Sequence, residues 1–439
     1  MSERRRAVVD VTLIAAAWLI LWFFAPHQIT SDGEHRFQAL SALFDRGVVA
    51  HDKWPLIGSL FVWPLYALGH LVQSPGWWVA RYNCLLLGLG AVALWRLLRR
   101  AVAPSTLRLF LLLLLTSGML PHETLDFGAE MFNAVAVAVG FAAWFTGRFT
   151  LGAVLLGLGV ANMPAAFVGL ALAMGRSLVR EKRLRAAVPV LLAAATWMAE
   201  NQLRKGSLLT TGYENESGYR TAMPYSGLPA FSYPAALGVL SLVFSFGKGL
   251  LFFTPGIFLP WRRERSAQPA PVRDLWWGWT LYVAGLVAVI SRWWAWYGGY
   301  AWGPRFLVSA SVPAAFVLAA RLRSGEASGL VRDLLLLVGV VLSAWAGVNG
   351  IAFNLTGQGL CLQNRYALEA FCWYVPEFSV LYTPLWNRPP LSTDQDVMLA
   401  FAALVLVWIS YPLVARIAAA AAAAVKKSAR ELLATGWRF

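Results

Sequence analysis

Apolar runs close to the length of a bilayer crossing recur along this chain, and they constrain its fold more than any other feature. A helix needs about 20 mostly apolar residues to cross a membrane, and the stretches 11–26, 330–351 and 397–416 approach or reach that length. Hydrophobic residues make up 59% of the 439 residues and charged residues only 13%. The sequence therefore predicts an all-α polytopic membrane protein with one transmembrane domain over 1–439, since no loop is long enough for a large soluble domain.

The formal net charge is +15, which in a soluble domain would indicate a nucleic-acid partner. Here the Lys and Arg residues cluster between the apolar runs, where they mark the cytoplasmic side of the membrane. The charge therefore reports topology, and we expect no nucleic-acid partner. The clusters lie at 4–6, 96–100, 176–185, 262–265, 321–323 and 426–427.

These markers place the N-terminus in the cytoplasm and predict about 11–13 transmembrane or partial helices. One of the two apolar stretches in 56–98 should be partial or interfacial, because two full crossings would leave the basic cluster that ends it outside. The stretch 150–175 should form a short hairpin broken at 162–164, since proline disfavours helix in the residue before it. Long external loops are expected at 27–55 and 352–394. The other predicted crossings are 105–120, 129–146, 186–203, 233–261 with a break at 247–249, 275–292 and 305–321.

The first external loop, 27–55, opens with two carboxylates, an imidazole and a guanidinium in the segment 30–36. Charged groups at the edge of so apolar a protein are costly and indicate a site. One interpretation makes Asp32 a general base for an attacking hydroxyl, with Glu34 holding the acceptor or a cation. The alternative is a solvated loop that caps an interfacial helix over 37–43.

Two cations lie next to glycines at the ends of later apolar runs. Lys248 stands between two glycines, and Arg305 follows a Gly-Pro pair. Lys248 either snorkels to the interface or binds an anion, because glycines let a ligand approach backbone N–H groups and a guanidinium grips phosphate at two points. We predict that Lys248, Arg305 and Arg36 bind a lipid-linked phosphate. The P-loop pattern Gly-x-x-x-x-Gly-Lys-Ser/Thr does not occur, which argues against ATP as the phosphate-bearing substrate.

Aromatic residues crowd the stretch 293–302, just before Arg305. Trp and Tyr form interfacial belts in membrane proteins, which is one explanation. The other is that they stack on a sugar face or an isoprenoid, and their position near Arg305 favours it. The candidate substrate-binding aromatics are Trp296, Tyr297, Tyr300 and Trp302.

Metal binding stays open at this stage. His35 and His51 share the first loop with several carboxylates, but no His-Glu-x-x-His or paired-cysteine spacing indicates zinc. A divalent cation held by carboxylates is the alternative. Cys361 and Cys372 share the loop 352–394, and an oxidising compartment would let them form a disulfide.

Six patches of the chain carry a family resemblance: 31–36, 39–47, 54–58, 63–69, 246–255 and 297–306. They resemble bacterial GT-C-fold glycosyltransferases, which use a polyprenyl-phosphate-linked sugar and include protein O-mannosyltransferases and lipid A aminoarabinose transferases. The resemblance implies the GT-C fold and a catalytic aspartate in the first loop, here Asp32. It also implies a second acidic residue from the next external loop, here Asp126 or Glu130, whereas His122 and Glu123 are interpreted as ordinary interface residues.

Together these patterns predict an inverting transferase that moves mannose, or a pentose such as arabinofuranose, from polyprenyl phosphate to a hydroxyl of a cell-envelope glycan or glycolipid. We expect it in a bacterial plasma membrane with the active site on the external, periplasmic face, because the unusual polar motifs fall in external loops. No cofactor is predicted beyond the divalent cation left open above. The rival interpretation is a flippase or transporter of lipid or lipid-linked sugar without bond chemistry, although the internal repeats typical of transporters are not evident.

Overall fold

The computed structural model describes residues 2–212, 220–324, 329–354, 367–387 and 389–434, and this part of the chain is built from helices. The first half contains α1 (Glu3–Phe23), α2 (Asp32–Arg46), η1 (Ser59–Val62), α3 (Trp63–Gly69), α4 (Pro75–Ala80), α5 (Tyr82–Leu98), α6 (Pro104–Thr116), η2 (His122–Thr124), α7 (Glu130–Phe145), α8 (Phe149–Ala161), η3 (Pro164–Ala166), α9 (Phe167–Glu181), η4 (Leu184–Ala187) and α10 (Val188–Lys205), where η marks a 3₁₀ helix.

The second half contains α11 (Ala235–Phe244), α12 (Leu250–Phe253), η5 (Pro255–Phe258), α13 (Arg262–Ser266), α14 (Ala270–Ile290), η6 (Arg305–Ala310), α15 (Ser311–Arg323), α16 (Leu330–Ala352), α18 (Glu369–Tyr374), η7 (Pro376–Phe378), α19 (Thr383–Trp386) and α20 (Thr393–Ala434). Among the described residues the β-type pairing is limited to one isolated bridge between Gln28 and Asp126. The prediction of an all-α polytopic protein is confirmed.

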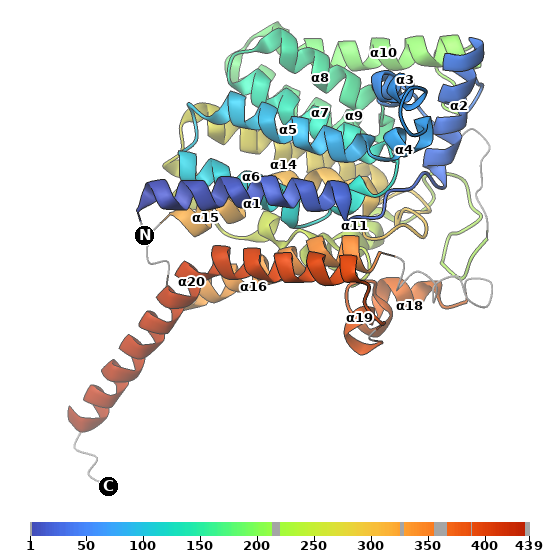
Figure 1. Cartoon of the computed structure of the whole chain (residues 1–439). Coiled ribbons are helices and arrows are strands. Elements are labelled where there is room, and N and C mark those ends of the chain that lie inside the picture. The colour runs from blue at the N-terminus through green and yellow to red at the C-terminus, as the bar shows by residue number, and fades with distance from the viewer. Residues whose placement is uncertain (1, 213–219, 325–328, 355–366, 388, 435–439) are drawn as a thin grey trace.

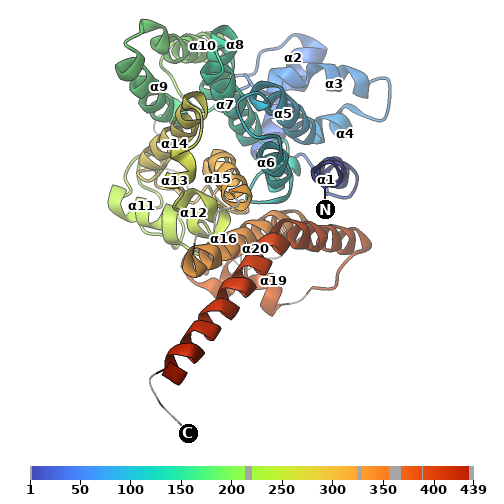
Figure 2. The same ribbon diagram turned by 90° about the vertical axis from the view of Figure 1, so that its left-hand side faces the viewer.

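The long helices lie side by side in one bundle (Figure 1), and α15 runs through its middle (Figure 2). Ser311 to Leu322 of α15 are all buried, which is what a helix that is apolar on every side requires. The helix α6, which packs against α15, and α7, which packs against η6, bury most of their residues as well. The apolar composition thus produces a core that extends along the length of the bundle.

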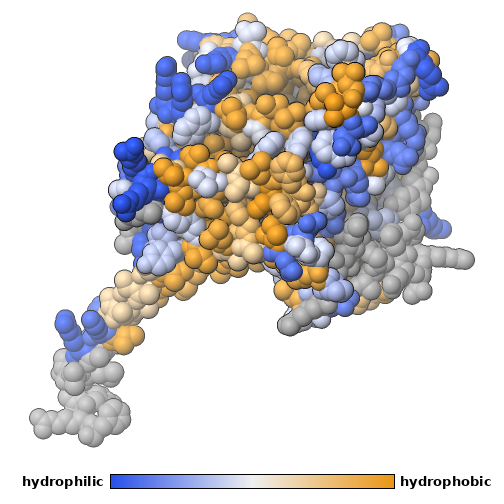
Figure 3. All heavy atoms as spheres, viewed as in Figure 1, coloured by the Kyte–Doolittle hydropathy of each residue, from blue (hydrophilic) through white to orange (hydrophobic). Residues whose placement is uncertain are grey.

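Four helices are long and apolar enough to cross a membrane by length and composition: Glu3–Phe23, Arg305–Arg323, Leu330–Ala352 and Thr393–Ser428. Shorter apolar helices accompany them, among them α5, α7 and α8. Figure 3 shows an apolar surface across the middle of the visible face, with polar side chains gathered at both ends. This distribution is that of a multi-pass membrane protein whose apolar band faces lipid.

The predicted irregularities occur at the expected places. The stretch 56–74 contains only the short elements η1 and α3, whereas α5 in 79–98 is a single helix of 17 residues. A break separates α8 from α9 at Asn162 to Pro164, and another separates α11 from α12 around Lys248. Proline and glycine therefore set the helix ends in this bundle.

Two regions contain more helix than we expected. The long loop 352–394 contains the short helices α18 and α19, and α20 is 42 residues long and continues well past 416. The last part of α20 projects away from the bundle (Figure 1). The helices α2, α3, α4 and α18 gather at the end of the bundle opposite to the start of α1, and this end carries the candidate site.

Candidate active site

Asp32 is the first residue of α2 and follows Ser31, whose φ of 50° lies in a region that few residues with a side chain adopt. Backbone strain of this kind costs about 1–3 kcal/mol and concentrates at functional sites. A carboxylate in the first helical turn is also stabilised by the helix dipole. The chain therefore presents Asp32 at a defined position where the first external loop becomes α2.

Arg305, which is distant from Asp32 in the sequence, forms an ion pair with it. Its Nη1 donates to Oδ2 of Asp32 at 3.0 Å, and the two side chains keep 24% and 27% of their surface exposed. Arg305 begins η6 directly after a turn in which Gly298, Gly299 and Gly303 all have positive φ. The glycine-rich turn thus brings this guanidinium to the carboxylate predicted to be the base.

Arg36 lies one turn after Asp32 on the same face of α2, and only 5% of it is exposed. Its Nε and Nη1, and also Nε of Arg305, are buried without a hydrogen-bond partner among the described residues. Unsatisfied N–H groups of two guanidiniums are donors that an anion could accept from. The structure brings Asp32, Arg36 and Arg305 together in one cluster.

The cations around Asp32 determine its protonation. Burial alone would raise the pKa of Asp32, but the positive charges of Arg305, Arg36 and Lys53 outweigh it and hold the pKa below its usual range. Asp32 is therefore ionised at neutral pH, which a proton acceptor requires.

Asp126 ties the first external loop to the second one. Its Oδ1 accepts from the backbone N–H of Thr30 at 3.1 Å and of Phe127 at 2.7 Å, and its Oδ2 accepts from the Thr30 hydroxyl. Gly33 packs so closely on this segment that an added Cβ would lie 2.9 Å from the carbonyl oxygen of Phe127. The two loops are therefore on the same side of the bundle, and the hydrogen bonds that Asp126 accepts hold them together.

Glu123 and Glu130 form an acidic pair beside Arg305. A Cβ added at Gly128 would lie 2.9 Å from Oε2 of Glu130 and 3.7 Å from Oε2 of Glu123, so both carboxylates face the same turn. Both also act electrostatically on Arg305. Burial, followed by the charge of Glu130, raises the pKa of Glu123 well above its usual range. The sequence interpretation missed Glu123; its spacing from Glu130 across a glycine was the available signal.

Lys248 is fully buried, and its ammonium group is saturated. Nζ donates to the backbone carbonyls of Gly299 at 3.2 Å, Ala301 at 2.5 Å and Gly303 at 2.9 Å. These three bonds use all three donors of an ammonium group. The geometry favours a role for Lys248 in shaping the turn before Arg305 over direct contact with a phosphate.

The predicted substrate-binding aromatics lie mostly inside the protein. Trp296, Tyr297 and Trp302 are buried, and Tyr300 is half-buried. The Trp302 indole donates to Oδ1 of Asn349 at 2.8 Å, and the Tyr297 ring stacks on Trp373 with a centroid distance of 5.4 Å. These contacts make the aromatic stretch a packed support for the turn, with Tyr300 the most accessible of the four.

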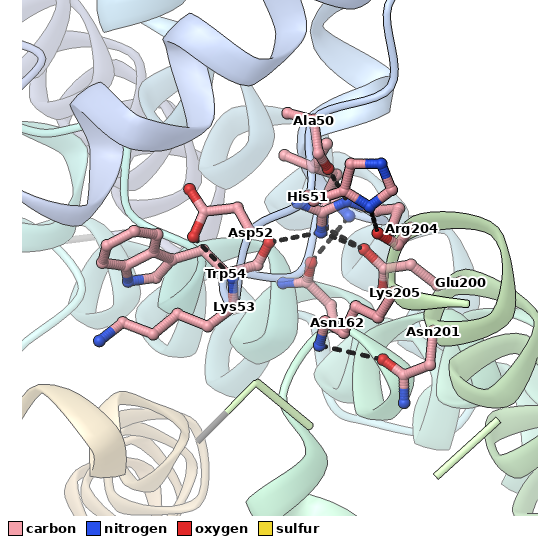
Figure 4. A network of polar contacts seen from close by, with 12 residues as sticks. Ala50, His51, Asp52, Lys53, Trp54, Asn162, Glu200, Asn201, Arg204 and Lys205 are labelled. Atoms are coloured by element: carbon pink, nitrogen blue, oxygen red, sulfur yellow. Dashed lines mark hydrogen bonds and ion pairs between the residues drawn. The ribbon is translucent and has the colours of Figure 1, made fainter. Parts of the chain in front are cut away.

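The later part of the first loop is fastened to the end of α10 (Figure 4). Arg204 donates to the carbonyls of Ala50 at 3.1 Å and Trp54 at 2.7 Å, and to Oε1 of Glu200 at 3.0 Å. The Lys53 and Trp54 side chains point away from this network in Figure 4. Lys53 acts electrostatically on Asp32, so the network positions one wall of the site.

The remaining candidates are placed as follows. Glu34 is exposed and accepts a hydrogen bond from Gln38 at 3.2 Å. No group of three or more His, Cys, Asp or Glu side chains suited to a metal ion occurs among the described residues. Cys372 is buried, whereas Cys361 lies outside the described residues, so their disulfide stays a prediction.

Comparison with known proteins identifies the fold. No protein-family model and no curated protein matches the chain. Among solved structures, ArnT from Cupriavidus metallidurans in the apo state matches with 14% identity and a TM-score of 0.54, over 95% of this chain and 75% of that one. The same protein bound to undecaprenyl phosphate matches with 12% identity and a TM-score of 0.51, over 94% and 79% of the two chains.

A third match is the archaeal oligosaccharyltransferase AglB from Archaeoglobus fulgidus, in complex with an inhibitory peptide and a dolichol-phosphate. It has 12% identity and a TM-score of 0.42, over 95% of this chain and 56% of that one, which is too low a score to assign a shared fold. The two ArnT matches show the fold: the chain has the GT-C fold, as predicted from the sequence.

Proposed function

We propose that this protein transfers a sugar from a polyprenyl-phosphate donor to an acceptor hydroxyl, with Asp32 as the base. The observation that carries the proposal is the cluster of Asp32, Arg305 and Arg36, in which an ionised carboxylate lies beside two guanidiniums with unpartnered N–H groups. The fold adds support, because ArnT, which shares it, has been crystallised with undecaprenyl phosphate.

The proposed reaction is a single displacement with inversion at the anomeric carbon. Asp32 takes the proton of the acceptor hydroxyl, while the oxygen of that hydroxyl forms a bond to the anomeric carbon of the donor sugar. The bond from that carbon to the phosphate oxygen breaks, and the polyprenyl phosphate leaves with the electron pair. It gains one negative charge in this step, which Arg305 and Arg36 are placed to stabilise.

Donor binding and base strength are coupled in this arrangement. Arg305 pairs with Asp32 in the free protein, and a donor phosphate would compete for the same guanidinium. As Arg305 shifts to the phosphate, Asp32 loses a stabilising charge, so its pKa rises and it becomes a stronger base. Lys248 contributes by fixing the turn that carries Arg305, and Glu130 acts on Arg305 through its charge.

The donors to test first are polyprenyl-phosphate mannose and polyprenyl-phosphate arabinofuranose, with cell-envelope glycans or glycolipids as acceptors. We place the reaction on the external face of a bacterial plasma membrane, because the basic clusters mark the opposite side as cytoplasmic. A second carboxylate, Glu130 or Asp126, would orient the acceptor; the charge of Glu130 on Arg305 supports Glu130 in this role.

The experiment that tests this function measures release of polyprenyl phosphate by the purified protein in liposomes, for each donor with an envelope glycan fraction as acceptor. We expect acceptor-dependent release with at least one donor, together with a glycan product that carries the sugar in inverted configuration. The rival function, a flippase, predicts movement of the lipid-linked sugar across the liposome membrane with no release of polyprenyl phosphate. That result would reject the proposal.

A further inference from the structure

Four helices meet around a buried carboxylate at the end of the bundle away from Asp32. Asp10 of α1 is fully buried, and its Oδ2 accepts from Arg108 of α6 at 3.1 Å and from Arg323 of α15 at 3.5 Å. Its Oδ1 accepts from the Trp408 indole of α20 at 2.9 Å. Arg323 ends α15, whereas Arg305 precedes it, so the two charged clusters lie at opposite ends of that helix.

Positive charge exceeds negative charge in this second cluster. Arg6 lies one turn before Asp10 on α1, and the charges of Arg6 and Arg108 are close enough to act on the guanidinium of Arg323. Among the described residues, Arg108 and Arg323 pair with Asp10, and Arg6 adds a third positive charge near Arg323. The side chains of Arg108 and Arg323 are only 7% and 10% exposed. Buried charge that lacks a partner is expensive, so an excess of this kind calls for an anion.

The three arginine side chains of this cluster also have hydrogen-bond donors without a partner. Nε of Arg6, Nη2 of Arg108 and Nε of Arg323 are buried without a hydrogen-bond partner among the described residues. The carboxylate of Asp10 accepts from Arg108, Arg323 and Trp408, whereas the side chain of Arg6 makes no ion pair among the described residues. The unmet donors and the unmatched charge therefore coincide in the cluster around Asp10.

We propose that Arg6, Arg108 and Arg323 form a binding site for a phosphate-bearing anion, either the headgroup of an anionic phospholipid or free phosphate. Guanidiniums bind phosphate oxygens through paired hydrogen bonds. The site lies where the basic end of α1 enters the apolar part of the bundle, which is the depth of a lipid headgroup. Basic pockets between transmembrane helices on the cytoplasmic side are known to bind such headgroups. This site is separate from the proposed transfer reaction.

The rival explanation is that the three arginines only tie the helices together. The two explanations predict opposite effects on stability when the charge of Arg6 is removed. The side chain of Arg6 makes no hydrogen bond or ion pair among the described residues. If the cluster awaits an anion, Arg6→Gln relieves repulsion, so the ligand-free protein keeps or gains stability. If Arg6 is structural, the same change lowers the unfolding temperature of the ligand-free protein.

The test is thermal unfolding of the detergent-purified full chain with added phosphatidylglycerol, phosphatidylcholine or inorganic phosphate. We expect phosphatidylglycerol to raise the Tm by at least about 2 °C, and phosphatidylcholine to leave it unchanged. A rise with millimolar inorganic phosphate would identify the free anion as sufficient, and a rise with phosphatidylglycerol alone would identify the lipid headgroup.

Arg6→Gln should reduce the rise by more than half, and Arg4→Gln, an exposed change on the same helix turn, should keep it. Arg323→Gln serves as a second variant and should lose the rise as well. The proposal is overturned if neither anion raises the Tm, if phosphatidylcholine raises it as much as phosphatidylglycerol, or if Arg6→Gln keeps the full rise or unfolds earlier than wild type without ligand.

Discussion

At the scale of single residues, the proposed mechanism depends on one guanidinium, which pairs with Asp32 in the free protein and which we propose to bind the donor phosphate. Arg305 pairs with Asp32 in the free protein, and the charge of Glu130 acts on the same guanidinium. An arginine with several acidic neighbours stays charged and stays in place. This is the arrangement expected of a group that must pass from a carboxylate to a phosphate without losing its position.

Arg305→Gln should change both donor affinity and the pH dependence of turnover. Loss of a charge-assisted contact worth about 1.5–3 kcal/mol weakens donor binding about 10- to 150-fold. Loss of the positive charge also raises the pKa of Asp32, which is now held below its usual range. The carboxylate then needs a higher pH to lose its proton, so the acid limb of kcat/KM moves to higher pH.

The measurement is a pH profile of kcat/KM for wild type, Arg305→Gln and the control Arg292→Gln, an exposed arginine at the same end of the bundle. Wild type and the control should share one acid limb, which lies below the ordinary aspartate pKa of about 4. An unshifted limb in Arg305→Gln would mean that Arg305 does not control the base.

The residues of this cluster differ in how far the sequence predicts them. Asp32 and Arg36 stand within one helical turn, so their proximity follows from the sequence itself. The pairing of Asp32 with Arg305 joins positions 273 residues apart, and only the tertiary fold brings them together. Lys248 was predicted to bind phosphate because it stands between glycines, but its ammonium group donates to three carbonyls of the turn 299–303, a contact that the local sequence does not show.

At the scale of elements, the site depends on how the first external loop is fastened. The loop is held at its start by Asp126 and at its end by Arg204 and Glu200 of α10 (Figure 4). Glu200 also accepts from the backbone N–H of Leu56 at 2.6 Å, so this ion pair closes the loop onto a rigid helix end. The loop is thus fixed at both ends, with Asp32 between them.

Arg204→Gln should loosen the end of that loop. The change removes one partner of a mostly buried ion pair, whose side chains are 5% and 11% exposed, and a loss of about 3–5 kcal/mol is the usual scale. We expect faster proteolytic cleavage within 47–55 and a higher KM at a less affected kcat. The control is Arg183→Gln, an exposed change outside the loop. Equal cleavage rates in wild type and Arg204→Gln would show that the loop is held by other contacts.

The elements themselves were more predictable than their contacts. Pro164 and the glycines around Lys248 break helices where the sequence places them, because these residue types act locally. The helix expected over 37–43 as an alternative to a catalytic loop exists, but it begins at Asp32 itself, and the side chain of Ser31 before it makes no capping hydrogen bond. The two interpretations of that segment are therefore compatible, since the helix start is what presents the carboxylate.

At the scale of the whole molecule, the charge distribution orients the bundle. The buried arginine cluster around Asp10 and the candidate site around Asp32 lie at opposite ends, with an apolar surface between them (Figure 3). The sequence predicts this polarity well, because the distribution of basic residues between apolar runs is a global property. It does not predict which side chains face each other inside, because that depends on helix packing.

The orientation has a chemical consequence for the cysteines. If the loop 352–394 is external, Cys361 and Cys372 meet an oxidising compartment and should form a disulfide. Thiol labelling of protein purified without reductant and then denatured should modify Cys84, a free and buried cysteine, and neither of the other two. Labelling of all three thiols would place the loop in the cytoplasm and would reverse the proposed orientation.

The central claim, that Asp32 is the base of a glycosyl transfer, is tested most directly by Asp32→Asn. The change removes the proton acceptor and almost no volume, so turnover should fall by about 10²–10⁴-fold. Binding of the polyprenyl-phosphate donor should stay the same or become tighter, because Arg305 no longer has a charged competitor. The matched control is Asp45→Asn at the other end of α2, which should keep turnover. Turnover near the wild-type rate in Asp32→Asn, with donor binding intact, would contradict the account.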